Sequence, residues 1–264
     1  MLPYNLHSHT FRCGHATGED EEFVLAAIKA GFKELGFSDH VFLPGVSQPG
    51  IRGEAFELEG YIDSVLALRE KYKDQIKIYL GFECEWYGPA FEGYYKSLLE
   101  KRGFDFLIMG QHCFLERNHL SWYFSLGPEL GPKRYANDLI DGMQSGLFTY
   151  VAHPDIYVAW CGEWNKRAYD IAHRIAFTSK LTGIPLEINC GYRESIETIA
   201  RADCLTYPSN YFWDIVGEYG CPVVIGVDAH NPLDYEKTQY AFYEGFAKKH
   251  RLNLLLENPL LKKK

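Results

Sequence analysis

Short apolar segments of β-strand length alternate along this chain of 264 residues with segments that have the apolar spacing of amphipathic helices. The predicted strands are residues 3–6, 34–38, 76–82, 104–109, 148–152, 185–188 and 223–227. The predicted helices are residues 19–30, 54–72, 91–101, 133–145, 163–182, 211–219 and 235–249. Strands that alternate with helices pair in parallel through right-handed crossovers. The order of the elements therefore predicts an α/β fold.

The chain length suits one closed or nearly closed α/β barrel, because such barrels have about 250 residues. No linker rich in proline, glycine and serine divides the sequence, and no internal repeat is visible. We therefore expect residues 1–264 to form a single domain. In a barrel, all the C-terminal strand ends lie on one face, and that face carries the chemistry. An open doubly wound sheet is the alternative, and it would spread the strand ends along a line.

Composition excludes several classes of protein. The chain is 47% hydrophobic and 16% aromatic, which argues against disorder. The net charge is −8 and no basic stripe is present, so we expect no nucleic acid as a stable partner. The seven cysteines lack CxxC spacing, and such unpaired cysteines fit a reducing compartment. The N-terminus does not resemble a signal peptide, and no apolar run approaches the roughly 18 residues of a membrane span. We predict a soluble, cytoplasmic protein without a membrane partner.

Histidines and carboxylates cluster where the predicted strands end. Seven of the ten histidines occupy such positions, namely His7, His9, His15, His40, His112, His153 and His230. Glu83 and Asp228 add carboxylates at two further strand ends. Neutral imidazole suits zinc, iron or manganese, and carboxylates can bridge two such ions. The clustering predicts a site for several metal ions in a metal-dependent hydrolase.

Local spacing supports this prediction. His7 and His9 are two residues apart on an extended segment, so their side chains point to the same side. An HxH pair alone is a weak signal, but here it is combined with a second pair, Asp228 and His230, and with Glu83. Glu85 lies two residues beyond Glu83 and is a competing candidate for the same ligand position.

The motifs, taken in order, resemble the PHP (polymerase and histidinol phosphatase) family over residues 5–230. They are N-L-H-S-H-T, C-G-H-A, S-D-H, G-F-E, G-Q-H, A-H-P-D and G-V-D-A-H. Within this family the chain is most similar to the stand-alone histidinol-phosphate phosphatases. The similarity lies in its length, the insert after His112, and the segments G-F-E-C-E-W and E-I-N-C-G-Y-R. The resemblance implies a distorted TIM-like (β/α)7 barrel with its active site at the C-terminal strand ends, which agrees with the strand pattern.

The resemblance also implies two or three divalent transition-metal ions (zinc, iron or manganese) and assigns their ligands. His7, His9, Glu83 and Asp228 would hold the first ion, His112 and His153 would hold the second with Glu83 as bridge, and His15, His40 and His230 would hold the third. Asp39 and Asp155 are expected to orient imidazoles or to move protons during catalysis, because metal-bound histidines generally need such partners.

The implied reaction is hydrolysis of L-histidinol phosphate to L-histidinol and phosphate, a step of histidine biosynthesis. A small phosphorylated substrate needs a local cation in an acidic protein. Arg193 is the first candidate, because a guanidinium matches phosphate bidentately; its alternative is an ordinary surface arginine. Arg52 is a weaker candidate, for which a solvated loop charge is the favoured alternative. In the insert, Trp122 and its neighbours are candidates to cover the substrate, although aromatics that anchor the loop are the favoured interpretation.

Three other functions fit parts of the pattern. A PHP-type phosphoesterase for another phosphomonoester or a nucleotide would have the same barrel and metals, because specificity resides in loops. A non-catalytic metal-binding module is the second, and the complete set of ligands argues against it. An amidohydrolase is the third; those barrels also use HxH, but usually with a carboxylated lysine or another order of ligands.

Overall fold

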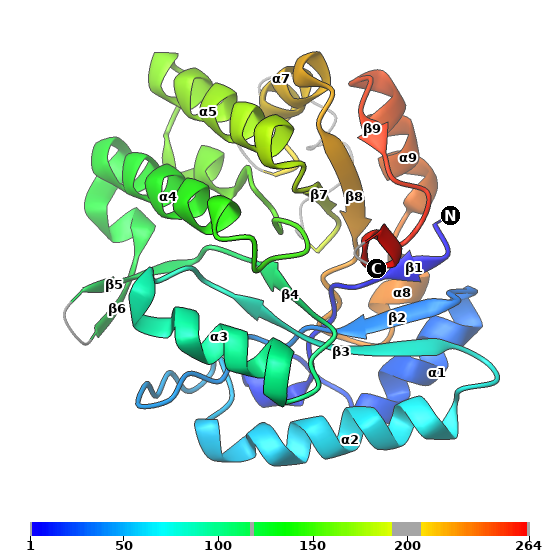
Figure 1. The fold of residues 1–264 in the computed structure, drawn as a ribbon. Helices are drawn as coiled ribbons and strands as arrows, with labels where there is room; N and C mark the ends of the chain where they lie inside the picture. The colour runs from blue at the N-terminus through cyan, green and yellow to red at the C-terminus, as the bar shows by residue number, and fades with distance from the viewer. Residues whose placement is uncertain (1, 117–118, 192–206, 263–264) are drawn as a thin grey trace.

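The computed structural model describes residues 2–116, 119–191 and 207–262. Parallel strands lie in the interior and helices cover them on the outside (Figure 1). In the described part of the chain, no helix combines the length and the apolar character that a membrane span requires.

The interior strands belong to two parallel sheets that isolated bridges connect. The first sheet has the order β1 (Tyr4–Asn5), β2 (Glu34–Phe37), β3 (Lys77–Cys84) and β4 (Phe106–Met109). The second has the order β7 (Leu186–Asn189), β8 (Pro222–Gly226) and β9 (Asn253–Leu254). Bridges join Met109 to Val151, Val151 to Leu186, and Ser8 to Ala229. The result is a mixed α/β fold around a curled parallel half-barrel sheet.

Residues 148–152, predicted as the fifth strand, form no regular strand, and their bridges to neighbouring strands lie at Val151. They nevertheless lie between β4 and β7. The backbone N–H of Met109 donates to the carbonyl of Tyr150, and the N–H of Glu187 donates to the carbonyl of Val151, at 3.0 and 2.8 Å. The segment therefore occupies the place in the sheet that the sequence predicted, with fewer paired residues.

The helices cover the outer face of the strands (Figure 1). They are α1 (Asp20–Ala30), α2 (Leu58–Lys71), α3 (Pro89–Lys101), α4 (Gly127–Gln144), α5 (Lys166–Thr182), α7 (Asn210–Tyr219), α8 (Asp234–Lys237) and α9 (Tyr240–Lys249). Gly31 ends α1 in the left-handed conformation, with φ 94°, directly after the predicted end of this helix at residue 30. The predicted last helix is split into α8 and α9, because Thr238 between them is extended.

The insert after β4 is more regular than the predicted loop. Its first part is an antiparallel hairpin of β5 (Cys113–Glu116) and β6 (His119–Trp122), and α4 begins at Gly127 rather than at residue 133. Pro132 lies inside α4 and has no N–H for the carbonyl four residues earlier. The Arg167 guanidinium donates to that carbonyl, at Pro128, over 3.0 Å. This replacement explains why the helix tolerates Pro132.

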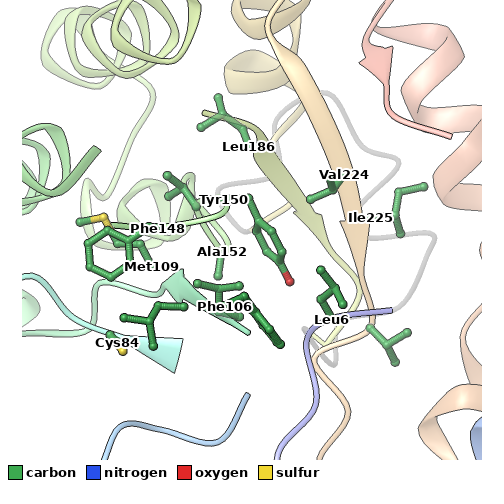
Figure 2. Close-up of a cluster of buried hydrophobic side chains, with 14 of the residues drawn as sticks. Leu6, Cys84, Phe106, Met109, Phe148, Tyr150, Ala152, Leu186, Val224 and Ile225 are labelled. Atoms are coloured by element: carbon green, nitrogen blue, oxygen red, sulfur yellow. The ribbon is translucent and has the colours of Figure 1, made fainter. Parts of the chain in front are cut away.

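Apolar side chains fill the space between the strands, as Figure 2 shows for residues of β3, β4, β7 and β8. The Phe106 ring is 1% exposed and lies where Gly81 lacks a side chain. A Cβ atom at Gly81 would be 2.4 Å from this ring, closer than any real contact. The apolar interior thus depends on a large residue on β4 that packs against a glycine on β3.

We expect Phe106→Ala to lower the free energy of unfolding by about 3–5 kcal/mol, because Gly81 has no side chain that could fill the cavity left by the ring. Urea unfolding of the metal-free protein measures the change. Phe56→Ala is the control, since Phe56 is 83% exposed, and it should change stability by less than about 0.5 kcal/mol. Similar losses in the two variants would contradict this packing.

Candidate metal centre

The strand ends bring all nine predicted metal ligands together. They are His7 and His9 after β1, His15 from the following loop, His40 after β2, Glu83 within β3, His112 after β4, His153 after residues 148–152, and Asp228 and His230 after β8. Four overlapping groups of donor atoms form among them, each with its atoms within 4.8 Å of one another: His7, His9 and Asp228; His9, His40 and Glu83; Glu83, His112 and His153; His15, His40 and His230. The first, third and fourth of these groups are called the first, second and third group below, after the ion positions that the family resemblance implies, and the number of ions stays a prediction.

The first group has the spacing of donors around one tetrahedral ion. His7 Nε2 and His9 Nε2 are 3.2 Å apart, and each lies 3.1–3.3 Å from Asp228 Oδ1. The carboxylate oxygens of Glu83 lie 3.5–3.6 Å from the same nitrogens. Donors about 2.0–2.1 Å from a tetrahedral ion are about 3.4 Å apart. One ion therefore fits among these four side chains.

Glu83 also belongs to the second group. His112 Nε2 and His153 Nε2 are 3.2 Å apart, and Glu83 Oε1 lies 3.0 Å from His153 Nε2. The other oxygen, Oε2, lies 3.0 Å from His40 Nδ1 and 3.5 Å from His9 Nε2. With its two oxygens facing different imidazoles, Glu83 is suited to bridge two ions.

The third group contains two imidazole nitrogens whose lone pairs face each other. His15 Nδ1 lies 3.1 Å from the carbonyls of Cys13 and Gly50, and His230 Nδ1 lies 3.0 Å from the carbonyl of Asp228. A carbonyl only accepts hydrogen bonds, so both Nδ1 atoms carry hydrogen in the neutral rings and both Nε2 atoms keep a lone pair. These Nε2 atoms face each other at 3.0 Å. Two lone pairs in this arrangement need a cation or a proton between them.

Carboxylates lie behind three of the histidines, two of them within hydrogen-bond distance. Glu187 lies 2.8 Å from His7 Nδ1, and Glu85 lies 3.2 Å from His112 Nδ1. Asp39, predicted to orient an imidazole, has Oδ1 3.8 Å from His9 Nδ1, and it accepts a hydrogen bond from Thr10. Such contacts leave the opposite ring nitrogen free for a metal. Glu85, the competing ligand, thus lies behind a ligand.

Sequence reasoning did not single out Glu187. The side chain is fully buried within β7 and also accepts hydrogen bonds from the His153 N–H and from Asn189. One signal was available, because a glutamate between Leu186 and Ile188 in a buried strand needs a charged or polar partner.

Asp155 does not lie directly behind a histidine nitrogen. Its Oδ2 accepts hydrogen bonds from the Ser209 N–H and from Trp213 Nε1, at 2.6 and 3.0 Å. Burial raises the pKa of Asp155 to about 7, although these hydrogen bonds act in the opposite direction. Asp155 therefore connects the strand end that carries His153 to the start of α7. Its predicted role in proton transfer stays a prediction.

The two candidate phosphate ligands have different outcomes. The Arg52 side chain is fully buried and forms an ion pair with Glu85, with Nη2 2.9 Å from Oε1. A guanidinium in this position is not available to a substrate, so the interpretation of Arg52 as a phosphate ligand is wrong, as is the alternative of a solvated loop charge. Arg193 lies outside the described residues.

A cavity of about 180 Å³ lies over the predicted metal ligands. Besides the ligands, its lining consists of Ile51, Trp122, Ile156 and Tyr207. The insert contributes Trp122 to this wall, whereas the neighbouring Tyr123 is buried and donates a hydrogen bond to Asp138. One aromatic of the insert thus faces the site and the next anchors the loop.

The neighbouring imidazoles favour the ionised form of the two carboxylates of the centre. Burial by itself raises the pKa of Glu83, but His112, His7 and His40 outweigh it and hold this pKa well below its ordinary value. The pKa of Asp228 is also held well below its ordinary value, because His7 and His230 outweigh the effect of burial. Anionic oxygens beside imidazole nitrogens give the centre the donors that a divalent cation needs.

The local backbone is adapted to the ligands. His153 and Asp228 have positive φ angles of 31° and 54°, which cost free energy in residues other than glycine. Glycines leave room for the carboxylates: a Cβ at Gly110 would be 1.8 Å from Glu83 Oε1, and a Cβ at Gly226 would be 1.7 Å from Glu187 Oε1. The strained backbone angles and the space beside the glycines therefore both occur at predicted metal ligands and their partners.

Comparisons with known proteins give a consistent result. Residues 5–191 match the PHP domain family. The chain is 28% identical to the "Probable histidinol-phosphatase" of Deinococcus radiodurans over 86% of this chain and 85% of that protein. It is 25% identical to the protein of the same name in Schizosaccharomyces pombe, over 88% of this chain and 81% of that protein.

The fold is similar to that of a solved structure from Lactococcus lactis, a histidinol phosphate phosphatase complexed with zinc, L-histidinol and phosphate. The TM-score is 0.72, the sequence identity is 18%, and the match covers 96% of this chain and 95% of that chain.

We expect Gly110→Ala to weaken metal binding, because the new Cβ would collide with the Glu83 carboxylate that two groups of ligands share. The variant should retain at least one ion fewer per chain than the wild type after dialysis, as measured by elemental analysis. Gly93→Ala is the control, because a Cβ on this residue of α3 meets nothing within 4 Å. Equal metal contents in the two variants would exclude steric displacement of Glu83.

Proposed function

The chain belongs to the PHP domain family, and we propose that it is a metal-dependent phosphomonoesterase that hydrolyses L-histidinol phosphate to L-histidinol and inorganic phosphate. The observation that carries this proposal is the sharing of Glu83 between two groups of histidines within one cluster of donor atoms. The names of the two relatives and the ligands of the Lactococcus lactis structure support the choice of substrate.

The donor set fits two or three divalent transition-metal ions. Imidazole nitrogens predominate and carboxylates complete the groups, which is a combination that suits zinc, iron and manganese. Zinc in the Lactococcus lactis structure supports this choice. When bound, such ions lower the pKa of water and neutralise negative charge on a phosphoryl group.

The protein's own residues would position these ions and the substrate. Glu187 and Glu85 lie within hydrogen-bond distance of His7 and His112 and would fix the orientation of these two rings, so the donors need little rearrangement. The cavity over the ligands would receive the phosphate at its base. Its wall includes Trp122 and Tyr207, whose rings can contact the flat imidazole of histidinol. In this arrangement the metal-binding residues would determine that a phosphate ester is hydrolysed, and the cavity wall would determine which ester is accepted.

The same proposal includes the finer description of the fold. We interpret the curled sheet as a distorted (β/α)7 barrel in one PHP-type domain of residues 1–264. The bridges at Val151 and between Ser8 and Ala229 support this interpretation, because they connect the two sheets on both sides. A single hydrophobic cluster that includes residues from Leu2 to Ala247 supports one domain.

We expect the purified protein to contain two or three transition-metal ions per chain and to release phosphate from L-histidinol phosphate faster than from 3′-phosphonucleotides or p-nitrophenyl phosphate. Phosphate release and metal content are measured on the same sample, before and after chelation. Chelation should abolish activity, and zinc, manganese or iron should restore it. A preference for a nucleotide would retain the phosphatase but refute the substrate. Full activity with at most one ion would refute the shared centre.

Arg193, four residues beyond β7, remains our candidate for the phosphate ligand on the basis of the sequence alone. Arg193→Ala should keep the metal content and lower kcat/KM by about 30- to 1000-fold, or about 2–4 kcal/mol, because a charge-assisted contact to the transition state is lost. Phosphate should inhibit the variant more weakly.

Arg193→Lys should recover only part of the loss, since an ammonium lacks the bidentate fork. Arg102→Ala is the control. Arg102 is partly exposed and forms an ion pair with Glu59 of α2, one of the helices outside the strands. Wild-type kcat/KM and wild-type phosphate inhibition in Arg193→Ala would exclude this residue from phosphate binding.

A further inference from the structure

The environment of Arg52 is unusually complete for a residue on a loop. Nη2 and Nη1 lie 2.9 and 3.2 Å from the two oxygens of Glu85. Nη1 also donates to the carbonyl of Val41 at 3.0 Å, and Nε donates to the side-chain oxygen of Gln48 at 2.8 Å. The guanidinium therefore has three partners, Glu85, Val41 and Gln48, and it binds the Glu85 carboxylate bidentately.

The carboxylate that Arg52 grips is the one behind a predicted metal ligand. Glu85 Oε1 lies 2.9 Å from Arg52 and 3.2 Å from His112 Nδ1. Since Arg52 contacts both oxygens, Glu85 cannot rotate its Oε1 away from the imidazole. The ring of His112 is thereby turned so that Nε2 faces His153 Nε2 at 3.2 Å.

The turn that carries Arg52 also contacts His15, which belongs to the third group of predicted ligands. The backbone N–H groups of Ile51 and Arg52 both donate to the carbonyl of Gln48, at 3.1 Å, which closes the turn. The carbonyl of Gly50 lies 3.1 Å from His15 Nδ1. The chain is also packed closely here, because a Cβ at Gly14 would lie 2.7 Å from the Cα of Gly50.

We propose that Arg52 is a positioning residue of the metal centre, which orients His112 through Glu85. The turn of residues 48–52, which carries Arg52, also places the Gly50 carbonyl beside His15 Nδ1. The inference rests on the metal centre of the proposed function and does not depend on which phosphomonoester is hydrolysed.

A contribution to folding stability does not by itself explain the buried ion pair of Arg52 and Glu85. Two buried charges lose their hydration, and replacing such a pair by uncharged residues of similar volume is often neutral or stabilising. Removing one partner alone leaves an uncompensated buried charge and destabilises the fold. A test of positioning must therefore remove both charges together.

The test uses the double variant Arg52→Met/Glu85→Gln, whose side chains are similar in size to the originals and uncharged. We expect the variant to fold and to bind one ion about 10- to 100-fold more weakly, the usual effect of losing a partner behind a metal-bound histidine. Competition with a chelator measures the affinity for zinc, and elemental analysis counts the ions that remain.

His112→Asn identifies the ion concerned. If Arg52 and Glu85 act through His112, adding His112→Asn to the double variant should remove no more ions than His112→Asn alone, since the effects of residues that act together are not additive. Loss of a further ion would contradict a route through His112. Arg102→Met is the control for a lost surface ion pair and should bind zinc as the wild type does.

Wild-type zinc affinity in the folded double variant would refute positioning and leave only packing. If the double variant does not fold, Arg52→Lys tests the proposal instead. Lysine keeps the positive charge but cannot form the same set of hydrogen bonds. Weakened zinc binding by Arg52→Lys supports the proposal, and unchanged binding refutes it. These measurements involve no phosphate ester, so a failure of the proposed substrate would appear separately, as absent phosphate release from a wild-type protein with full metal content.

Discussion

The buried carboxylate of Glu83 lies 3.0–3.6 Å from imidazole nitrogens of five histidines, His7, His9, His40, His112 and His153. It is 1% exposed, so water cannot compensate its charge, and only these nitrogens and cations among them can. The position of Glu83 follows from the register of β3, in which it is paired with Ile108 of β4. A slip by one residue would turn it to the other face of the sheet. The metal centre therefore depends on the pairing of β3 with its neighbours.

The strands that carry this centre are held by apolar contacts between them. Buried charged groups cost several kcal/mol unless they are paired, and two of the predicted ligands, His153 and Asp228, also have strained backbone angles. Packing such as that of Phe106 against Gly81 supplies the free energy that holds the strand ends in place. The partners behind the histidines contribute differently, because they select which ring nitrogen faces the centre. Interior packing thus sets where the strand ends lie. Carboxylates and carbonyls behind the histidines set how the imidazole rings are oriented.

Sequence reasoning predicted the order of strands and helices because apolar periodicity is a local property. It was less accurate where contacts between distant segments decide the structure. The N-terminal start of α4 was missed because Arg167 of another helix satisfies the carbonyl that Pro132 leaves free. Glu187 was missed because its partner, His7, is 180 residues away in the chain. Arg52 was misinterpreted for the same reason, since an arginine in a glycine-containing loop resembles a solvated charge until Glu85 is placed beside it.

The sequence by itself determined which kinds of side chain stand at the strand ends, since strands that alternate with helices place their C-terminal ends on one face whatever the details of packing. The chemistry of imidazoles and carboxylates, and therefore the preference for divalent metals, was determined at the same level. Only the tertiary structure decided which nitrogen of each ring faces the centre, which glutamate lies among the histidines and which lies behind one, and how closely the groups approach. These features depend on distances of 3–4 Å between atoms on separate strands, as between His112 and Glu85, and no local pattern along the chain encodes such distances.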